Sequence, residues 1–190
     1  MNWIEATATI FGVIAVWLVV RRHILCWPTG LVQVALYVWI FYQTKLYSDM
    51  ILHIIYVFLQ IYGWYHWSHP DNKNKELPVT RSSTPIWQWS VLVLIGAAVW
   101  GYLMATYTDA ALPWPDAFIV VASLVAQWLT ARKHLESWLF WIVVNVVAIF
   151  VYWAKDLYFT TGLYIVFLVL AILGFIEWRK AMQSPRATTE

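Results

Sequence analysis

The sequence predicts an all-α integral membrane protein with seven transmembrane helices. Hydrophobic residues make up 62% of the 190 positions and charged residues only 12%, about half of the roughly 25% that is usual in soluble domains. The mean hydropathy is +0.65, and seven apolar runs approach the length of about 20 residues that a helix needs to cross a bilayer. The 15 Trp and 11 Tyr suit a protein with many membrane interfaces, where amphipathic rings settle.

Short polar or proline-containing segments separate the apolar runs. The expected spans are 3–20, 24–42, 50–67, 86–107, 116–131, 135–153 and 157–178. The first run lacks a basic start and a small-residue cleavage site, so we expect a retained span rather than a signal peptide. Between the later spans we expect a proline-bounded loop over 109–115, and after the last span a frayed tail over 179–190.

The basic residues satisfy the positive-inside rule when the N-terminus lies outside. Seven crossings then leave only Lys45 and Lys155 outside, and place the other ten of the twelve Lys and Arg in the cytoplasm. This distribution predicts an outer N-terminus and a cytoplasmic C-terminus. The net charge of +2 is too small to indicate a nucleic-acid partner, and the single cysteine, Cys26, permits no internal disulfide.

The chain resembles itself when it is shifted by 111 positions. The matches are Arg21-Arg22-His23 with Arg132-Lys133-His134, Trp27 with Trp138, Leu46-Tyr47 with Leu157-Tyr158, Gly63 with Gly174, and Trp67 with Trp178. They predict a three-helix repeat over 1–67, a linker over 68–85, a linker helix over 86–108, a second repeat over 109–178, and a tail over 179–190. Because one span joins two halves of three spans each, the two repeats have the same orientation in the membrane. Transporters built from parallel repeats bind their ligand between the repeats near the midplane.

One face of the expected sixth span combines two tryptophans with an amide. Trp138, Trp141 and Asn145 are spaced i, i+3 and i+7, which places them on one side of a helix. An asparagine surrounded by hydrocarbon is costly unless it faces protein, water or a ligand. Two interpretations follow, an interhelical hydrogen bond and a polar ligand site with an aromatic wall.

Other polar side chains lie deep within the expected spans. His53, Tyr56 and Gln60 share one face of the third span, and Tyr164 is the repeat partner of His53. No Asp, Glu, Lys or Arg lies mid-span, whereas ion coupling normally uses a buried carboxylate, so the pattern favours facilitated diffusion without metal or cofactor. Trp and Tyr faces attract a cationic ring by about 0.5–2 kcal/mol each. The candidate substrate-binding residues are Gln33, His53, Tyr56, Gln60, Trp138, Trp141, Asn145 and Tyr164.

The chain resembles the bacterial Pnu vitamin transporters over nearly its whole length. The resemblance rests on Trp138-x-x-Trp141-x-x-x-Asn145, Leu157-Tyr158, Leu46-Tyr47 and Ile61-Tyr62-Gly63-Trp64-Tyr65-His66-Trp67. It implies a 3+1+3 arrangement of spans with parallel repeats, like a SWEET-type transporter, assembled as a homotrimer in the bacterial inner membrane. It also implies uptake of a vitamin precursor by facilitated diffusion, with a cytoplasmic kinase that traps the substrate by phosphorylation.

The substrate implied by this resemblance is nicotinamide riboside, with thiamine as the alternative. The family's nicotinamide riboside members often carry Asn, Gln and Asn where this chain has Gln33, His53 and Gln60. Related transporters with the same fold carry thiamine. Both substrates are cationic heteroaromatic molecules with a hydroxyl that a kinase can phosphorylate, so aromatic walls do not separate them.

Two other classes of function lack their motifs. The chain contains no H-E-x-x-H, no G-x-S-x-G and no paired carboxylates within a span, so an enzyme is not predicted. A retinal-binding sensor would need a lysine inside the seventh span, and Lys180 lies beyond its expected end. The sequence therefore predicts a transporter.

Overall fold

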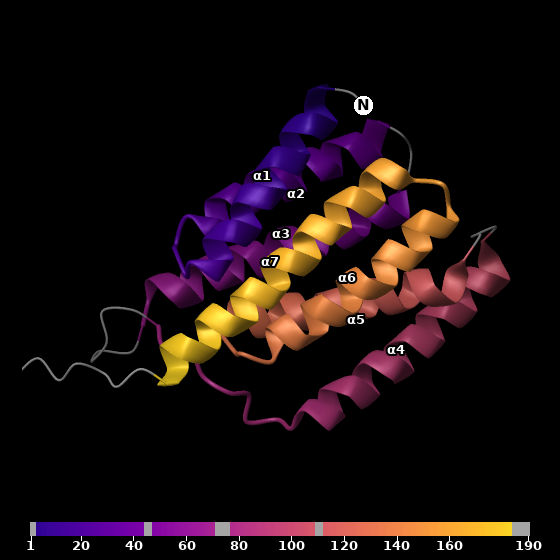
Figure 1. The fold of residues 1–190 in the computed structure, drawn as a ribbon. Helices are drawn as coiled ribbons and strands as arrows, with labels where there is room; N and C mark the ends of the chain where they lie inside the picture. Colours follow the sequence, from indigo (N-terminus) through magenta and orange to yellow (C-terminus); the bar gives the residue numbers. More distant parts are fainter. Residues whose placement is uncertain (1–2, 44–46, 71–76, 109–111, 184–190) are drawn as a thin grey trace, which may run out of the picture.

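The computed structural model describes residues 3–43, 47–70, 77–108 and 112–183. This part of the chain forms seven α-helices (Figure 1), which are α1 Trp3–Val20, α2 Cys26–Gln43, α3 Tyr47–Ser68, α4 Ile86–Tyr107, α5 Pro113–Ala131, α6 Ser137–Ala154 and α7 Tyr158–Gln183. Among the described residues, α1, α4, α5, α6 and α7 are long and apolar enough to cross a membrane. The two helices outside that group, α2 and α3, carry the polar residues Gln33, His53 and Gln60.

The helix bounds lie within three residues of the expected spans except at the C-terminal end of α7. α3 begins at Tyr47 rather than at 50. α5 begins at Pro113 rather than at 116, because proline has the φ angle of a first helical turn and lacks only an N–H that is unpaired there. Residues 113–115 are therefore helical rather than part of a loop. α7 continues to Gln183, so the first residues of the expected frayed tail are helical as well. Lys180 lies in the last turn, where its positive charge interacts favourably with the helix dipole.

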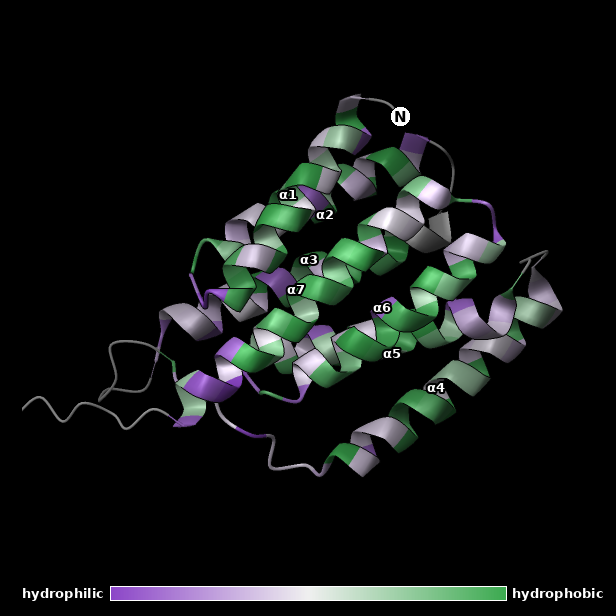
Figure 2. Cartoon of the chain, viewed as in Figure 1, coloured by the Kyte–Doolittle hydropathy of each residue, from purple (hydrophilic) through white to green (hydrophobic). Residues whose placement is uncertain are grey.

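Six of the helices form a closed ring of neighbours. Around the ring, α1 contacts α2, α2 contacts α3, α3 contacts α5, α5 contacts α6, α6 contacts α7, and α7 contacts α1. α4 packs on α5 outside the ring, at the lower right of Figure 1. Figure 2 shows hydrophobic residues along the helices and hydrophilic residues gathered in the turns and at the end of α7. The first helix of each half thus contacts the third helix of the other half.

The turns that end α1 and α5 share one geometry. Arg22 and Lys133 both have a φ angle of 58°, the left-handed conformation that commonly ends a helix. In each turn the N–H of the next residue, a histidine, donates to a carbonyl oxygen five residues earlier at 2.9 Å. We call this end of the ring the basic end; its turns contain Arg21, Arg22, Arg132 and Lys133.

Four buried tryptophans lie together at the basic end of the ring. The ring centroid of Trp67 is 5.2 Å from that of Trp27 and 5.9 Å from that of Trp178, which in turn is 5.3 Å from Trp138. All four side chains are 6% exposed or less. Two come from each half of the chain, and we call them the tryptophan cluster.

The third helix of each half is hydrogen-bonded to the first helix of the other half. The indole N–H of Trp67 in α3 donates to the carbonyl oxygen of Ala131 at the end of α5, at 3.1 Å. The indole N–H of Trp178 in α7 donates to the carbonyl oxygen of Val19 near the end of α1, at 3.0 Å. These two bonds hold the halves together at the basic end in the same way from both sides.

The linker residues 77–85 pass along the turn between α5 and α6. Thr80 forms a parallel β-bridge with His134, and its Oγ1 lies 3.0 Å from the Nδ1 of that histidine. The backbone N–H of Ser82 donates to the Glu136 carboxylate at 2.9 Å. The linker is therefore attached to the second half through both backbone and side-chain groups.

Protonation of His134 is expected to weaken this attachment. Burial lowers the pKa of His134 below its ordinary value of 6.5, with a smaller opposing effect of Glu136. The unfolded chain then binds the proton more readily, so the stability is highest above pH 6.5 and falls as the pH drops below it. Thermal unfolding in detergent from about pH 8 to about pH 5 should show a smaller decrease in Tm for His134→Gln than for the wild type. Parallel decreases would contradict this assignment.

Candidate functional site

Three amide side chains inside the helices have unused hydrogen-bonding capacity. Asn145 in α6 is only 4% exposed, and Gln33 in α2 and Gln60 in α3 are half-buried. Within the described residues, no hydrogen bond joins any of these amides to another group, so the interhelical bond considered for Asn145 is not present there. These amides keep some accessible surface, because the fully buried polar side-chain atoms without a partner in the described residues are the Trp27 and Trp138 indole nitrogens and the Ser137 hydroxyl oxygen. A polar ligand at these positions would satisfy the three amides.

Two glycines let the glutamine amides lie close to a neighbouring helix. Gln33 lies over Gly12 of α1, where an added Cβ would come 2.7 Å from the amide nitrogen. Gln60 lies over Gly30 of α2, where the corresponding distance is 2.5 Å. Both amides are therefore held by contacts within the first half, and a side chain at either glycine would displace them.

His53 is surrounded by aromatic rings of the first half. Its ring centroid lies 4.9 Å from Phe41, 5.3 Å from Tyr37 and 5.7 Å from Tyr56. Two of these neighbours come from α2 and one from α3, the helix of His53 itself. The imidazole therefore adds a polar group to an otherwise aromatic wall.

Tyr164 of α7 occupies the corresponding place in the second half. It stacks on Tyr152 of α6 with centroids 5.0 Å apart, as His53 packs against Phe41, and the two pairs are related by the 111-residue shift. Each half therefore carries an aromatic pair at corresponding positions.

Tyr56 connects the two halves directly. Its hydroxyl is hydrogen-bonded to the hydroxyl of Ser123 in α5, with the two oxygens 2.5 Å apart, and Ser123 is only 6% exposed. Ser123 was not expected from the sequence, because a lone serine in an apolar helix usually bonds only to its own backbone. The one available signal was its pairing with Gly12 in the 111-residue shift.

Trp138 is not available to stack on a ligand in this structure. It is 2% exposed, packs edge-on against Trp178 with centroids 5.3 Å apart, and covers Gly174 of α7. The helical rise places it about 10 Å nearer the basic end than Asn145. Of the predicted residues, Trp138 therefore belongs to the tryptophan cluster, and its neighbours leave no ring face open.

Trp141 has a different environment from Trp138. It is half-buried, and its indole N–H donates to the Thr130 hydroxyl of α5 at 3.1 Å. The Thr130 hydroxyl in turn donates to the Ala126 carbonyl oxygen at 2.8 Å, which fixes its acceptor lone pair toward the indole. Trp141, one helical turn from Asn145, is thus the tryptophan that is oriented beside the buried amide.

The two halves match at the basic end and differ where the amides lie. The matching features are the turns and the tryptophan cluster. The differing pairs in the 111-residue shift are Asn145 with Val34, Gln60 with Ala171, Gln33 with Val144, and Trp141 with Gly30. The polar surface of the middle is therefore not two-fold symmetric, as a site for one small unsymmetric molecule must be.

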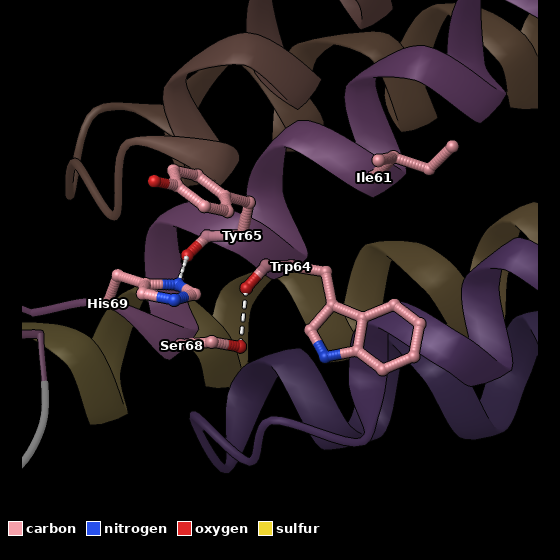
Figure 3. Close-up of a pocket in the computed structure, with 5 residues that line it drawn as sticks. All are labelled: Ile61, Trp64, Tyr65, Ser68 and His69. Atoms are coloured by element: carbon pink, nitrogen blue, oxygen red, sulfur yellow. Dashed lines mark hydrogen bonds between the residues drawn. The ribbon is translucent and has the colours of Figure 1, made fainter.

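An open groove of about 270 Å³ lies on α3 near the basic end (Figure 3), lined by Ile61, Trp64, Tyr65, Ser68 and His69. Two polar groups of its lining, the Ser68 hydroxyl and the His69 Nδ1, are bonded to their own helix. The Ser68 hydroxyl donates to the Trp64 carbonyl oxygen at 2.7 Å, and the His69 Nδ1 lies 3.0 Å from the Tyr65 carbonyl oxygen. This groove presents mainly apolar ring surface and does not contain the predicted site residues.

Comparison with known proteins identifies the family. A family model described as "Nicotinamide mononucleotide transporter" matches residues 2–180. The chain belongs to this family. The nicotinamide riboside transporter PnuC of Escherichia coli is 28% identical over 94% of this chain and 85% of its own length. PnuC of Neisseria mucosa is 29% identical over 96% of this chain and 74% of its own length.

A transporter of another type and a solved structure also match this chain. The riboflavin/roseoflavin transporter RibM of Streptomyces davaonensis is 26% identical over 93% of this chain and 84% of its own length. The crystal structure of the vitamin B3 transporter PnuC shares the fold with a TM-score of 0.75 and 28% identity, over 95% of this chain and 82% of that one. The predicted Pnu relationship and the all-helical fold are confirmed. The chain is a multi-pass membrane transporter and not an enzyme.

Proposed function

We propose that this protein carries nicotinamide riboside across the bacterial inner membrane by facilitated diffusion. The observation that carries this proposal is Asn145, a 96% buried amide at the middle of α6 without a partner among the described residues. Buried polar groups inside a membrane protein mark substrate pathways. The names of the relatives, three of them PnuC nicotinamide riboside transporters in different bacteria, point to the same substrate.

The chemistry of the candidate site suits this molecule. Nicotinamide riboside has a flat cationic ring with a carboxamide, and a sugar with hydroxyl groups. Asn145, Gln33 and Gln60 each offer donors and an acceptor to such groups, and Trp141 offers a ring for cation–π stacking. Since the middle of the helices holds no Asp, Glu, Lys or Arg, transport needs no coupled ion, and phosphorylation by a cytoplasmic kinase would keep the product inside.

We extend the proposal to the topology. All seven helices cross the membrane, with the N-terminus outside and the basic end in the cytoplasm. α2 and α3 can cross with polar residues because Gln33 and Gln60 lie against neighbouring helices. The halves 1–67 and 109–178 form SWEET-like parallel repeats that α4 joins from outside the ring, as the paired turns and the paired Trp–carbonyl bonds support. The homotrimer is part of the same proposal, with α4 as the outermost helix of each protomer.

Calorimetric titration of the purified protein tests the substrate. Nicotinamide riboside is expected to bind more tightly than thiamine, the alternative substrate, or riboflavin, the substrate type that the RibM relative suggests. In proteoliposomes, uptake of radiolabelled nicotinamide riboside should follow its own gradient and stay unchanged when sodium and proton gradients are dissipated. Tighter binding of thiamine or riboflavin would show that nicotinamide riboside is not the preferred substrate. Loss of uptake when an ion gradient is dissipated would exclude facilitated diffusion.

A further inference from the structure

The hydrogen bonds around Ser123 define a direction. The Ser123 hydroxyl donates to the Val120 carbonyl oxygen at 2.9 Å, and a carbonyl oxygen can only accept. A serine hydroxyl has one proton, which this bond uses. Either oxygen could donate in the 2.5 Å contact between Ser123 and Tyr56; with the Ser123 proton on the Val120 carbonyl, the tyrosine is the donor. The chain of donors runs from the Tyr56 O–H to the Ser123 O–H and ends at the Val120 carbonyl.

This direction determines what Tyr56 can offer to a ligand. Its only proton points to α5, so its oxygen retains acceptor capacity alone. Tyr56 shares a helix face with His53 and Gln60, and its hydroxyl meets Ser123 of the opposite half. Its oxygen therefore lies between the two halves, where the proposed substrate binds, and it favours a ligand that brings a donor.

We propose that Ser123 is a specificity-determining positioning residue that holds the Tyr56 hydroxyl as a pure hydrogen-bond acceptor. The inference rests on the proposed function. It adds that the site selects substrates with an N–H or O–H donor opposite Tyr56, either a primary carboxamide or a sugar hydroxyl. Ser123 acts through Tyr56 and does not itself touch the substrate. In the 111-residue shift Ser123 pairs with Gly12, which has no hydroxyl. The first half therefore has no equivalent of Ser123, and the selection takes place on one side of the site.

The test compares three ligands by calorimetry. Nicotinic acid riboside lacks the carboxamide donor, and nicotinamide 2′-deoxyriboside lacks one sugar donor, so the two analogues distinguish the sources of the donor. In the wild type, one of them should bind more weakly than nicotinamide riboside. In Ser123→Ala the tyrosine proton is released and can turn toward the ligand. The Kd of the weaker-binding analogue divided by the Kd of nicotinamide riboside should therefore fall about 5–10-fold, the change expected for one hydrogen bond.

Two further variants separate positioning from packing. Ser123→Thr keeps the hydroxyl and is expected to retain the wild-type ratio, whereas a merely structural role would make both substitutions alike. In a Tyr56→Phe background, Ser123→Ala should change the ratio no further. An unchanged ratio for both analogues in Ser123→Ala, or an equal effect with and without the Tyr56 hydroxyl, would overturn the assignment.

A measurement without substrate keeps this inference separate from the proposed function. The Raman Fermi doublet of tyrosine reports whether a phenol donates or accepts a hydrogen bond. The difference spectrum between wild type and Tyr56→Phe should show a donor phenol that is lost in Ser123→Ala. Failure of the wild type to bind nicotinamide riboside would refute the proposed substrate, while an acceptor-type spectrum for Tyr56 would refute the donor direction.

Discussion

Replacing Asn145 with leucine is expected to abolish uptake of nicotinamide riboside while the protein remains folded and assembled. Leucine has a similar size but cannot form the hydrogen bonds that the buried amide offers to a ligand. Loss of one or two such bonds weakens binding by about 1–3 kcal/mol, or roughly 5–150-fold. Uptake into proteoliposomes and calorimetric binding measure the effect.

The stability of the same variant makes the prediction specific. The Asn145 amide has no hydrogen bond to another described residue, so Asn145→Leu removes no such bond and should leave the Tm unchanged or raise it, as is common for residues that serve function. Val146→Leu, on the exposed side of the same helix, is the matched control and should transport normally. Normal transport by Asn145→Leu would remove this residue from the site, and a fall in Tm would indicate a structural role.

Replacing Gly174 with alanine is expected to destabilise the protein strongly. The added Cβ would fall inside contact distance of the Trp138 ring, which is boxed in by Trp178 and has no free space to move. Overpacking of this kind costs about 1–3 kcal/mol. The apparent Tm in detergent and the folded fraction after size-exclusion chromatography should both fall.

Gly162 and Gly63 provide the matched comparisons. Gly162 lies in the same helix but has nothing within 4 Å of an added Cβ, so Gly162→Ala should be neutral or slightly stabilising because it restricts the unfolded chain. Gly63 covers Trp27 in the first half as Gly174 covers Trp138 in the second. Gly63→Ala should therefore lower stability as Gly174→Ala does. Similar Tm values for all three variants would show that the tryptophan cluster adjusts without cost.

Much of this fold could be predicted because hydropathy and turn signals are local. The seven helices follow from apolar runs that end at charged or proline-containing segments, and the largest boundary differences are at 47–49, at 113–115 and beyond 178. The internal repeat could be predicted as well, because the 111-residue shift compares residue types at matched positions and needs no knowledge of contacts. It paired Trp27 with Trp138 and Gly63 with Gly174, which make the same Trp-on-Gly contact in the two halves.

The candidate site could be predicted only as a set of residue types. Helical spacing places Trp138, Trp141 and Asn145 on one face of a helix. It does not show which residues of other helices pack against each of them. In the structure, Trp178 and Gly174 cover the first of these residues, while Asn145 is left with an unpaired amide. The same spacing therefore includes one residue of the tryptophan cluster and two candidates for ligand contact.

The membrane class, the order of helices, the internal similarity and the family can be read from the amino-acid sequence, because each depends on residues that are near in the chain or matched by position. The ring of helices, in which each half contacts the other through its first and third helices, is known from the three-dimensional contacts. The tertiary structure alone brought Tyr56 to Ser123, 67 residues away, because a hydrogen bond between helices depends on their relative rotation and height. No pattern along a single helix contains that information.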